Sequence, residues 1–285
     1  MELTAQIVIN KHGVKQDERG LSNMQGLTYD SYERGSNFNK PVIIVSAPTG
    51  AGKSFIFEKC ISEKKENLIF VVPTIELSTN LMESFRETCR NKGFKDDIIN
   101  NRIHVFNSST IKEELDYFQN GKNRANMIYN ASYVEENDKN DLGHIIFITP
   151  ETLFSLLNNR MRFHNQGVEY TPLSFIGGAI WNRIIIDESH LLTHKMIGFF
   201  ANLISFICKS KNKAFQNYTQ FVFLSATQID YNKILNKCGI SSDFIHYIDE
   251  KICEDNCDRY IHGNVTIKFV KGDINDVVKD ELEHN

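Results

Sequence analysis

Several features that would place this sequence in a special class are missing from it. No apolar run approaches the ~18 residues of a membrane-spanning helix, and the sequence contains no internal repeat and no low-complexity tract. The first residues, MELTAQIVINKHG, lack the basic flank and the long apolar stretch of a secretion signal. We therefore expect a cytoplasmic protein with no membrane partner.

Basic residues are not in excess. Lys and Arg number 32 against 36 Asp and Glu, so the net charge is −4 with neutral histidines. This balance argues against a protein that covers nucleic acid with a broad basic face, but not against one that grips a strand locally. Six cysteines are scattered through a chain too long to need a disulfide framework, so we expect reduced thiols.

The composition is that of an ordinary globular protein. The chain has 285 residues, of which 41% are hydrophobic and 24% charged, enough for one large domain or two small ones. Short apolar runs recur, and most are continuous rather than alternating, as in strands buried on both faces of a parallel sheet. These runs are 42–45, 68–72, 103–106, 145–148, 184–186, 221–224 and 265–270.

Helical patterns lie between the apolar runs. Leu77, Leu81, Phe85 and Cys89 fall four residues apart, and Gly93 is the predicted stop. The stretch 191–210 is too long for one strand and predicts a buried helix, and a further helix is expected over 27–34. The alternation predicts a doubly wound, mostly parallel α/β sheet flanked by helices.

Three parts of the chain follow from this pattern. Residues 1–40 are expected to hold a strand and a helix, residues 41–264 the main α/β domain, and residues 265–285 a linker with the start of a further domain. Within the main domain, the polar segment 107–141 predicts an insertion and residues 158–178 predict a loop.

A glycine-rich segment stands between a predicted strand and a predicted helix, which is the context of a phosphate-binding loop. Its glycines let backbone N–H groups curl around an anion, and the helix N-terminus adds partial positive charge. Lys53 would reach the β- and γ-phosphates of ATP, and Ser54 would offer its hydroxyl to Mg²⁺. Ala47 departs from the GxxxxGK[ST] pattern, and a chance glycine loop is the plain alternative. The expected ATP-binding residues are Pro48, Thr49, Gly50, Ala51, Gly52, Lys53 and Ser54.

Two acids follow the apolar strand 184–186. At the carboxyl end of a parallel strand, Asp187 would hold Mg²⁺, and Glu188 would orient and polarise the attacking water. His190 completes the predicted catalytic set of Lys53, Asp187, Glu188 and His190. The alternative to a catalytic role is an exposed strand end whose two acids are simply solvated.

Another apolar strand, 221–224, ends in small hydroxylated residues. Ser225 and Thr227 are predicted to hydrogen-bond the acid–histidine segment and to couple the nucleotide site to neighbouring surfaces. A simple strand cap by Ser and Thr is the structural alternative.

The segments APTGAGKS, VVPTIELSTN, ITPETL, IIIDESH and FLSAT resemble motifs I, Ia, Ib, II and III of superfamily 2 DExH-box helicases, in the family's order and spacing. The sequences APTGAGKS, ITPETL and DESH are most similar to the corresponding motifs of CRISPR-associated type I effector helicases. The resemblance implies an N-terminal RecA-like domain that hydrolyses ATP and binds single-stranded nucleic acid, with DNA weakly favoured over RNA.

The resemblance also implies residue roles. Motifs Ia and Ib contact the phosphates of the strand, which gives that role to Pro73, Thr74, Thr149, Pro150 and Glu151. Backbone amides and hydroxyls at helix N-termini can hold phosphates without a basic face. Local positive potential would come from Arg86, Arg90, Lys92, Lys95 and Arg102, unless these form a solvated helix face.

Gln25 falls where many relatives carry an adenine-reading glutamine, which would make the helix within 1–40 the adenine side of the site. A surface glutamine is the alternative. The family's second RecA-like domain carries an arginine-rich motif VI, and no QxxGRxGR-like segment occurs in these 285 residues. We therefore expect a second RecA-like domain as a partner, in cis or in trans.

Three alternatives remain open from the sequence. The chain could be a nucleic-acid-binding scaffold that holds ATP without turnover of its own. It could be a P-loop ATPase of another branch, although the order of motifs Ia, Ib and III argues against this. Cys253 and Cys257, with His246 and His262 nearby, could hold zinc or lie in a loop as reduced thiols.

Overall fold

The computed structural model describes residues 6–9, 13–33, 40–106, 142–157, 163–165, 168–170, 181–209, 219–227, 231–253, 257–261 and 265–268. The chain divides into two compact units, Met24–Glu250 and a smaller unit of Met1–Asn23 with Lys251–Asn285. The domain boundaries expected after residues 40 and 264 stay predictions. The insertion expected over 107–141 lies outside the described residues. Within those ranges, no helix is long and apolar enough to cross a bilayer.

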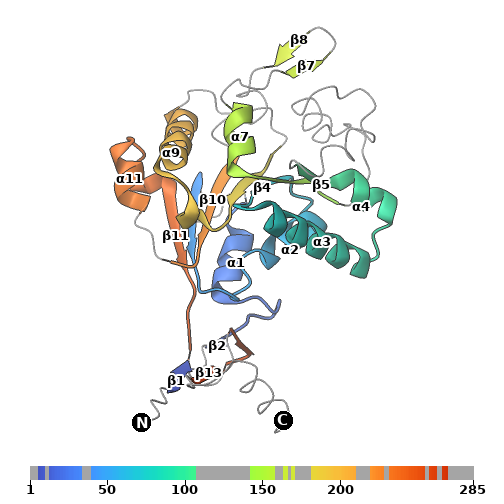
Figure 1. The fold of residues 1–285 in the computed structure, drawn as a ribbon, viewed down its shortest axis with the longest axis vertical. Coiled ribbons are helices and arrows are strands. Elements are labelled where there is room, and N and C mark those ends of the chain that lie inside the picture. The colour runs from blue at the N-terminus through green and yellow to red at the C-terminus, as the bar shows by residue number, and fades with distance from the viewer. Residues whose placement is uncertain are drawn as a thin grey trace, which may run out of the picture. The chain divides into compact units, whose positions relative to one another are not determined.

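The larger unit is built on a seven-stranded parallel sheet in the order β11-β3-β10-β9-β4-β6-β5 (Figure 1). Its strands are β3 (Val42–Ser46), β4 (Leu68–Val71), β5 (Ile103–Phe106), β6 (Ile145–Ile148), β9 (Arg183–Ile186), β10 (Gln220–Ser225) and β11 (Ile245–Asp249). The predicted doubly wound α/β fold is confirmed.

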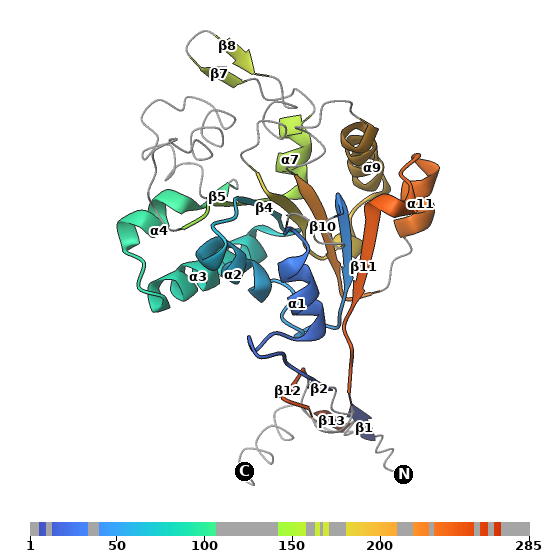
Figure 2. The same cartoon turned by 180° about the vertical axis from the view of Figure 1, so that it is seen from behind.

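Helices cover both faces of the sheet, with α1, α2 and α3 on one side and α7, α9 and α11 on the other (Figures 1 and 2). The helices of this unit are α1 (Asn23–Asp30), α2 (Phe55–Glu63), α3 (Ile75–Asn91), α4 (Asp96–Arg102), α7 (Pro150–Leu157), α9 (His194–Lys209) and α11 (Tyr231–Lys237). Two 3₁₀ turns, Ser189–Leu191 and Ser242–Phe244, complete it.

Aromatic side chains join the first helical layer to the sheet. Phe70 of β4 meets Phe57 of α2 at a ring-centroid distance of 5.6 Å, and Phe85 of α3 meets Phe147 of β6 at 5.2 Å. Both contacts are edge-to-face, the geometry that aromatic pairs prefer. Successive strand residues point to opposite faces, so a sheet covered on both sides needs apolar residues at every position.

The second helical layer encloses the other part of the core. Phe200 of α9 contacts Phe223 of β10 at 6.3 Å, and Phe223 also contacts Tyr231 at the start of α11. Because α9 buries one side and leaves Phe206 exposed, it is an amphipathic covering helix rather than the fully buried helix expected over 191–210. The helix begins at His194, a few residues later than expected, because a separate 3₁₀ turn at Ser189–Leu191 precedes it.

Three further expectations need correction. The run 265–270 does contain a strand, β13 (Val265–Lys268), but it pairs antiparallel with β1 (Gln6–Ile9) in the smaller unit and is not part of the seven-stranded parallel sheet. The seventh strand of the parallel sheet is β11, an edge strand in which Ile245 and Ile248 are the buried residues. The helix expected over 27–34 is α1, about one turn earlier, and the loop 158–178 includes a hairpin of β7 (Phe163–Asn165) and β8 (Val168–Tyr170).

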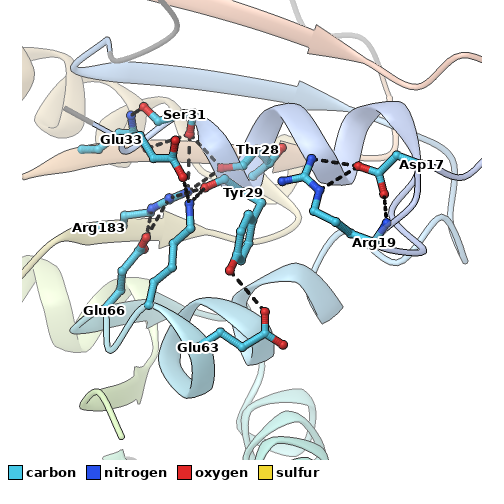
Figure 3. A network of polar contacts seen from close by, with 11 residues as sticks. Asp17, Arg19, Thr28, Tyr29, Ser31, Glu33, Glu63, Glu66 and Arg183 are labelled. Atoms are coloured by element: carbon cyan, nitrogen blue, oxygen red, sulfur yellow. Dashed lines mark hydrogen bonds and ion pairs between the residues drawn. The ribbon is translucent and has the colours of Figure 1, made fainter. Parts of the chain in front are cut away.

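A buried ion pair fixes the carboxyl end of α1 (Figure 3). Arg183, the fully buried first residue of β9, contacts both carboxylate oxygens of Glu66, with its Nε 2.8 Å and its Nη2 3.0 Å away. Its Nη1 donates to the carbonyl of Thr28 at 2.7 Å, and its Nη2 donates to that of Tyr29 at 3.3 Å. Burial acts to lower the pKa of Arg183, but Glu66, together with Cys60 and Tyr32, acts in the opposite direction and the pKa is raised overall. The guanidinium therefore satisfies carbonyls that the end of a helix leaves without intrahelical partners.

Candidate functional site

The glycine-rich loop leaves β3 and enters α2 as expected. Gly50 and Gly52 have φ angles of 81° and 79°, in the left-handed region that favours glycine. The amide of Ala51 donates to the carbonyl of Pro48 at 3.2 Å, which tightens the turn. Thr49 and Gly50 are exposed at the tip, whereas Ala47 and Ala51 are buried against the sheet. The departure from glycine at Ala47 thus falls at a packed position before the tip.

Lys53 folds back over its own loop. Its Nζ donates to the carbonyl of Ala47 at 2.9 Å and to that of Pro48 at 3.3 Å. Burial lowers the pKa of Lys53, and the nearby charges of Glu188 and Asp187 act in the opposite direction. The Lys53 ammonium is therefore held beside the loop by two backbone carbonyls, and a bound anion can take their place.

Asp187 lies beside the loop. Its Oδ2 is 3.4 Å from the hydroxyl of Ser54, and its Oδ1 accepts the backbone N–H of Glu188 at 2.9 Å. The amide of Asp187 donates to the carbonyl of Val71, so β4 fixes its backbone. Burial, and then the charge of Glu188, raise the pKa of Asp187 to about 6. A hydroxyl and a carboxylate at this spacing are a donor pair of the kind that Mg²⁺ takes.

Glu188 has a left-handed backbone, with φ 44° and ψ 45°. A non-glycine residue in this region is uncommon and costs conformational energy, and such strain gathers at functional sites. The side chain turns toward His190, whose Nδ1 lies 3.3 Å from the carboxylate. The left-handed residue thus places the Glu188 carboxylate beside His190 directly after the end of β9.

At the end of β10, Ser225 contacts the same histidine, and Thr227 contacts Ser225. Ser225 Oγ is 3.4 Å from His190 Nδ1 and 3.3 Å from Thr227 Oγ1. This contact was predicted from the sequence. The contact between Ser225 and His190 arises from the strand order. Because β10 lies between β3 and β9, its end stands between the strand that precedes the loop and the strand that precedes the acids.

Two hydrogen bonds to carbonyls of β10 connect the ends of the three strands. The amide of Ala47 donates to the carbonyl of Ser225 at 3.1 Å. On the other side of β10, the buried hydroxyl of Ser189 donates to the carbonyl of Leu224 at 2.9 Å. Sequence reasoning missed Ser189, although a small hydroxylated residue directly after the acids was a usable signal.

Gln25 lies against the loop from the α1 side. Its Nε2 donates to the carbonyl of Gly52 at 3.1 Å and to that of Ala51 at 3.5 Å, and its side chain is buried. The alternative of a surface glutamine is therefore wrong. The contacts assign Gln25 a role in holding the loop, and adenine recognition stays a prediction.

The residues of motifs Ia and Ib stand at the carboxyl ends of the neighbouring strands β4 and β6. Thr74 caps α3, where its Oγ1 accepts the amide of Leu77 at 3.2 Å. Thr149 has the same relation to α7, accepting the amide of Thr152 at 3.3 Å. Thr74 and Glu151 are exposed, Pro73 and Thr149 are half-buried, and Pro150 is buried. Two helix N-termini thus open on the same edge of the sheet as the nucleotide loop.

The cations expected to add local positive potential are largely engaged elsewhere. Arg86 pairs with Glu83, Arg90 with Asp96 and Lys92 with Glu63, and Arg102 is buried. Arg90 and Lys92 thus fit the alternative of a solvated helix face, whereas the buried Arg102 does not. The zinc alternative gains no support either, since no cluster of three or more His, Cys, Asp or Glu side chains suited to a metal occurs within the described ranges.

A parallel sheet that carries a glycine-rich loop after one strand and a pair of acids after another, with a third strand between them, is the architecture of a P-loop, RecA-like motor domain. More narrowly, the chain belongs to the DEAD/DEAH box helicase family, whose model matches residues 34–234. No curated protein sequence matches the chain.

Solved structures agree on the fold. The DUF1998 helicase MrfA bound to DNA has a TM-score of 0.50 and 16% identity, over 86% of this chain and 32% of MrfA. MrfA bound to DNA and AMPPNP gives the same values. The Hef helicase domain of Pyrococcus furiosus has a TM-score of 0.46 and 17% identity, over 83% of this chain and 40% of Hef. The chain thus spans about a third of MrfA.

Proposed function

We propose that this chain binds and hydrolyses ATP as the first motor domain of a nucleic-acid helicase or translocase. The observation that carries the proposal is the convergence at one sheet edge of Lys53 and Ser54 with Asp187 and Glu188, where Ser54 Oγ lies 3.4 Å from Asp187 Oδ2. Membership in the DEAD/DEAH box helicase family supports it.

The donor set fits a triphosphate with Mg²⁺. Gly50 and Gly52 have left-handed backbones and carry no Cβ that would crowd an anion at the loop. Ser54 and Asp187 offer the hard oxygen ligands that Mg²⁺ prefers. When bound, the metal neutralises negative charge on the phosphates.

Each residue then has a task of its own. Lys53 exchanges the carbonyls of Ala47 and Pro48 for phosphate oxygens. Asp187 binds metal as the carboxylate, so it must lose the proton that its raised pKa favours below about pH 6. Glu188 orients the attacking water and accepts its proton, while His190 links Glu188 to Ser225. Gln25 holds the loop and, in this proposal, reads the adenine.

Single-stranded nucleic acid is the proposed partner. Thr74 and Thr149 stand at helix N-termini on the site's edge of the sheet, where amides and hydroxyls can hold phosphates. Pro73, Pro150 and Glu151 flank them, although the buried Pro150 would act only by shaping the turn. A DNA strand is weakly favoured over RNA, in keeping with the DNA-bound MrfA structures.

A second RecA-like domain, in cis or in trans, is proposed to complete the site with an arginine. An arginine of this type raises the rate ~10³–10⁵-fold. A cytoplasmic location and a CRISPR-associated role remain predictions that rest on the sequence.

ATPase assays with and without single-stranded DNA or RNA test the proposal. We expect slow turnover that single strands accelerate once a second RecA-like domain is supplied. Thr74→Ala with Thr149→Ala should reduce the stimulation ratio, whereas Thr79→Ala, one turn further along α3, should keep it. Binding of ATP and strand without any turnover would favour the scaffold alternative, and turnover that ignores both nucleic acids would favour an ATPase of another branch.

A further inference from the structure

Two cysteines of the smaller unit face each other. Cys253 Sγ and Cys257 Sγ are 2.8 Å apart, and Cys257 Sγ also contacts the carbonyl of Cys253 at 3.2 Å. Both residues are thiols and both are half-buried. A disulfide needs a sulfur–sulfur bond of about 2.05 Å, so a small movement separates this arrangement from a covalent link.

Backbone contacts hold the pair on strand β2 (Gly13–Val14). Cys253 exchanges two hydrogen bonds with Gly13, at 3.1 Å and 2.9 Å. The amide of Asp258, next to Cys257, donates to the carbonyl of Val14 at 3.1 Å, and the amide of Gln16 donates to the Asp258 carboxylate at 2.8 Å. The strand β12 (Arg259–Tyr260) continues the pairing with β2. Both ends of the Cys253–Cys257 segment are therefore anchored on the same short strand.

Gly13 makes room for the two sulfurs. A Cβ at this position would lie 2.2 Å from Cys257 Sγ, well inside van der Waals contact. The sulfur of Cys257 thus occupies the space that any other residue at position 13 would fill. The close approach of the thiols depends on this glycine.

Other cysteines of the chain have different surroundings. Cys60 and Cys89 are buried in the α2–α3 side of the core, where burial raises the pKa of both thiols, that of Cys89 to about 11. Cys208 is also buried, on α9. A thiol reacts as its thiolate and only where a reagent can reach it. Cys238 is half-buried like Cys253 and Cys257, so what distinguishes the pair is a second sulfur at 2.8 Å.

We propose that Cys253 and Cys257 form a redox-active dithiol that a hydroperoxide converts to an intrachain disulfide. One thiolate attacks the peroxide oxygen, which gives a sulfenic acid and releases water when the oxidant is hydrogen peroxide. The second thiol displaces the sulfenic oxygen as a second water, so two thiols and one peroxide yield one disulfide and two waters. A thiol reductant reverses the reaction by exchange.

Mass spectrometry of the folded chain tests the proposal. After brief treatment with hydrogen peroxide, alkylation and trypsin, the peptide 252–259 contains both cysteines. We expect this peptide to lose the mass of two hydrogens and to regain it on reduction, while the peptides with Cys60 and Cys89 stay alkylated.

Variants distinguish disulfide formation by Cys253 and Cys257 from general oxidation of cysteines. Cys253→Ser should abolish the loss of two hydrogens, and Cys238→Ser should leave it intact. Gly13→Ala keeps both thiols but displaces Cys257, so the disulfide should form more slowly in protein that circular dichroism shows to be folded. Independent overoxidation of Cys253 and Cys257, or disulfides between separate chains instead, would overturn the proposal, as would equal rates in the Gly13→Ala variant.

Discussion

Replacing Arg183 with methionine removes a buried guanidinium and keeps a side chain of similar reach. Arg183 is fully buried, and Glu66, its partner, is almost so. The variant loses both contacts to the Glu66 carboxylate and both bonds to the carbonyls of Thr28 and Tyr29. Figure 3 shows that these groups come from α1, from the segment after α2 and from β9, so one side chain joins three elements.

The size of the expected loss in stability depends on the charge that the substitution leaves buried without a partner. Removing one partner of a buried ion pair leaves an uncompensated charge and costs about 3–5 kcal/mol. Replacing both partners with apolar residues often costs little, and the carbonyls of Thr28 and Tyr29 keep the Ser31 hydroxyl and the Lys64 ammonium as donors. We therefore expect Arg183→Met to lose about 3–5 kcal/mol of unfolding free energy. The double variant with Glu66→Leu should recover part of that loss.

Urea unfolding followed by circular dichroism measures these differences. Glu66→Leu alone should be as damaging as Arg183→Met, because it leaves the guanidinium buried without its carboxylate. If Arg183→Met costs less than about 1 kcal/mol, a value typical of exposed pairs, the ion pair does not anchor α1. If the double variant is less stable than either single variant, the uncompensated charge is not the main cost.

Three further variants probe the site. Asp187→Asn should raise the stability of the ligand-free protein at pH 8 by up to about 3 kcal/mol, because a folded pKa of about 6 against an ordinary 3.8 means that ionisation destabilises the fold. Wild-type stability should accordingly rise as the pH falls from about 6 toward 4, and a flat profile in thermal unfolding would contradict this. Glu188→Gln should keep ATP and Mg²⁺ binding but block hydrolysis, and turnover within a few-fold of wild type would exclude Glu188 as the base. Thr74→Ala should cost about 1 kcal/mol through loss of the α3 cap, and an unchanged urea midpoint would show that the cap adds nothing.

Sequence reasoning located the sheet where burial is uniform. Six of the seven strands were visible as apolar runs because helices cover both of their faces. The edge strand β11, IHYID, was missed because polar and exposed residues interrupt its two buried residues, Ile245 and Ile248, so that it forms no continuous apolar run. The run at 265–270 was misplaced because its partner, β1, comes from the far end of the chain, and no local pattern encodes that pairing.

The sequence indicated which segments form the candidate site, but not which of their side chains contact one another. The loop, the acids and the hydroxyl pair could be expected to meet because the carboxyl ends of parallel strands share one edge. The position of β10 between β3 and β9, which brings Ser225 to His190, depends on strand order and is not written in either segment. The buried pair of Arg183 and Glu66 was missed, although a charged residue at the head of the run RIIID was a signal.

Titration calorimetry of Mg²⁺–ATP into the wild-type chain and into Lys53→Ala tests the central claim most directly. The wild type should bind ATP in a Mg²⁺-dependent manner, and Lys53→Ala should lose at least about ten-fold in affinity, or about 1.4 kcal/mol. Lys59→Ala, which removes a lysine from the adjoining α2, should bind as the wild type does. Undiminished affinity in a folded Lys53→Ala variant, or no Mg²⁺-dependent binding by the wild type, would contradict a nucleotide site at this edge of the sheet.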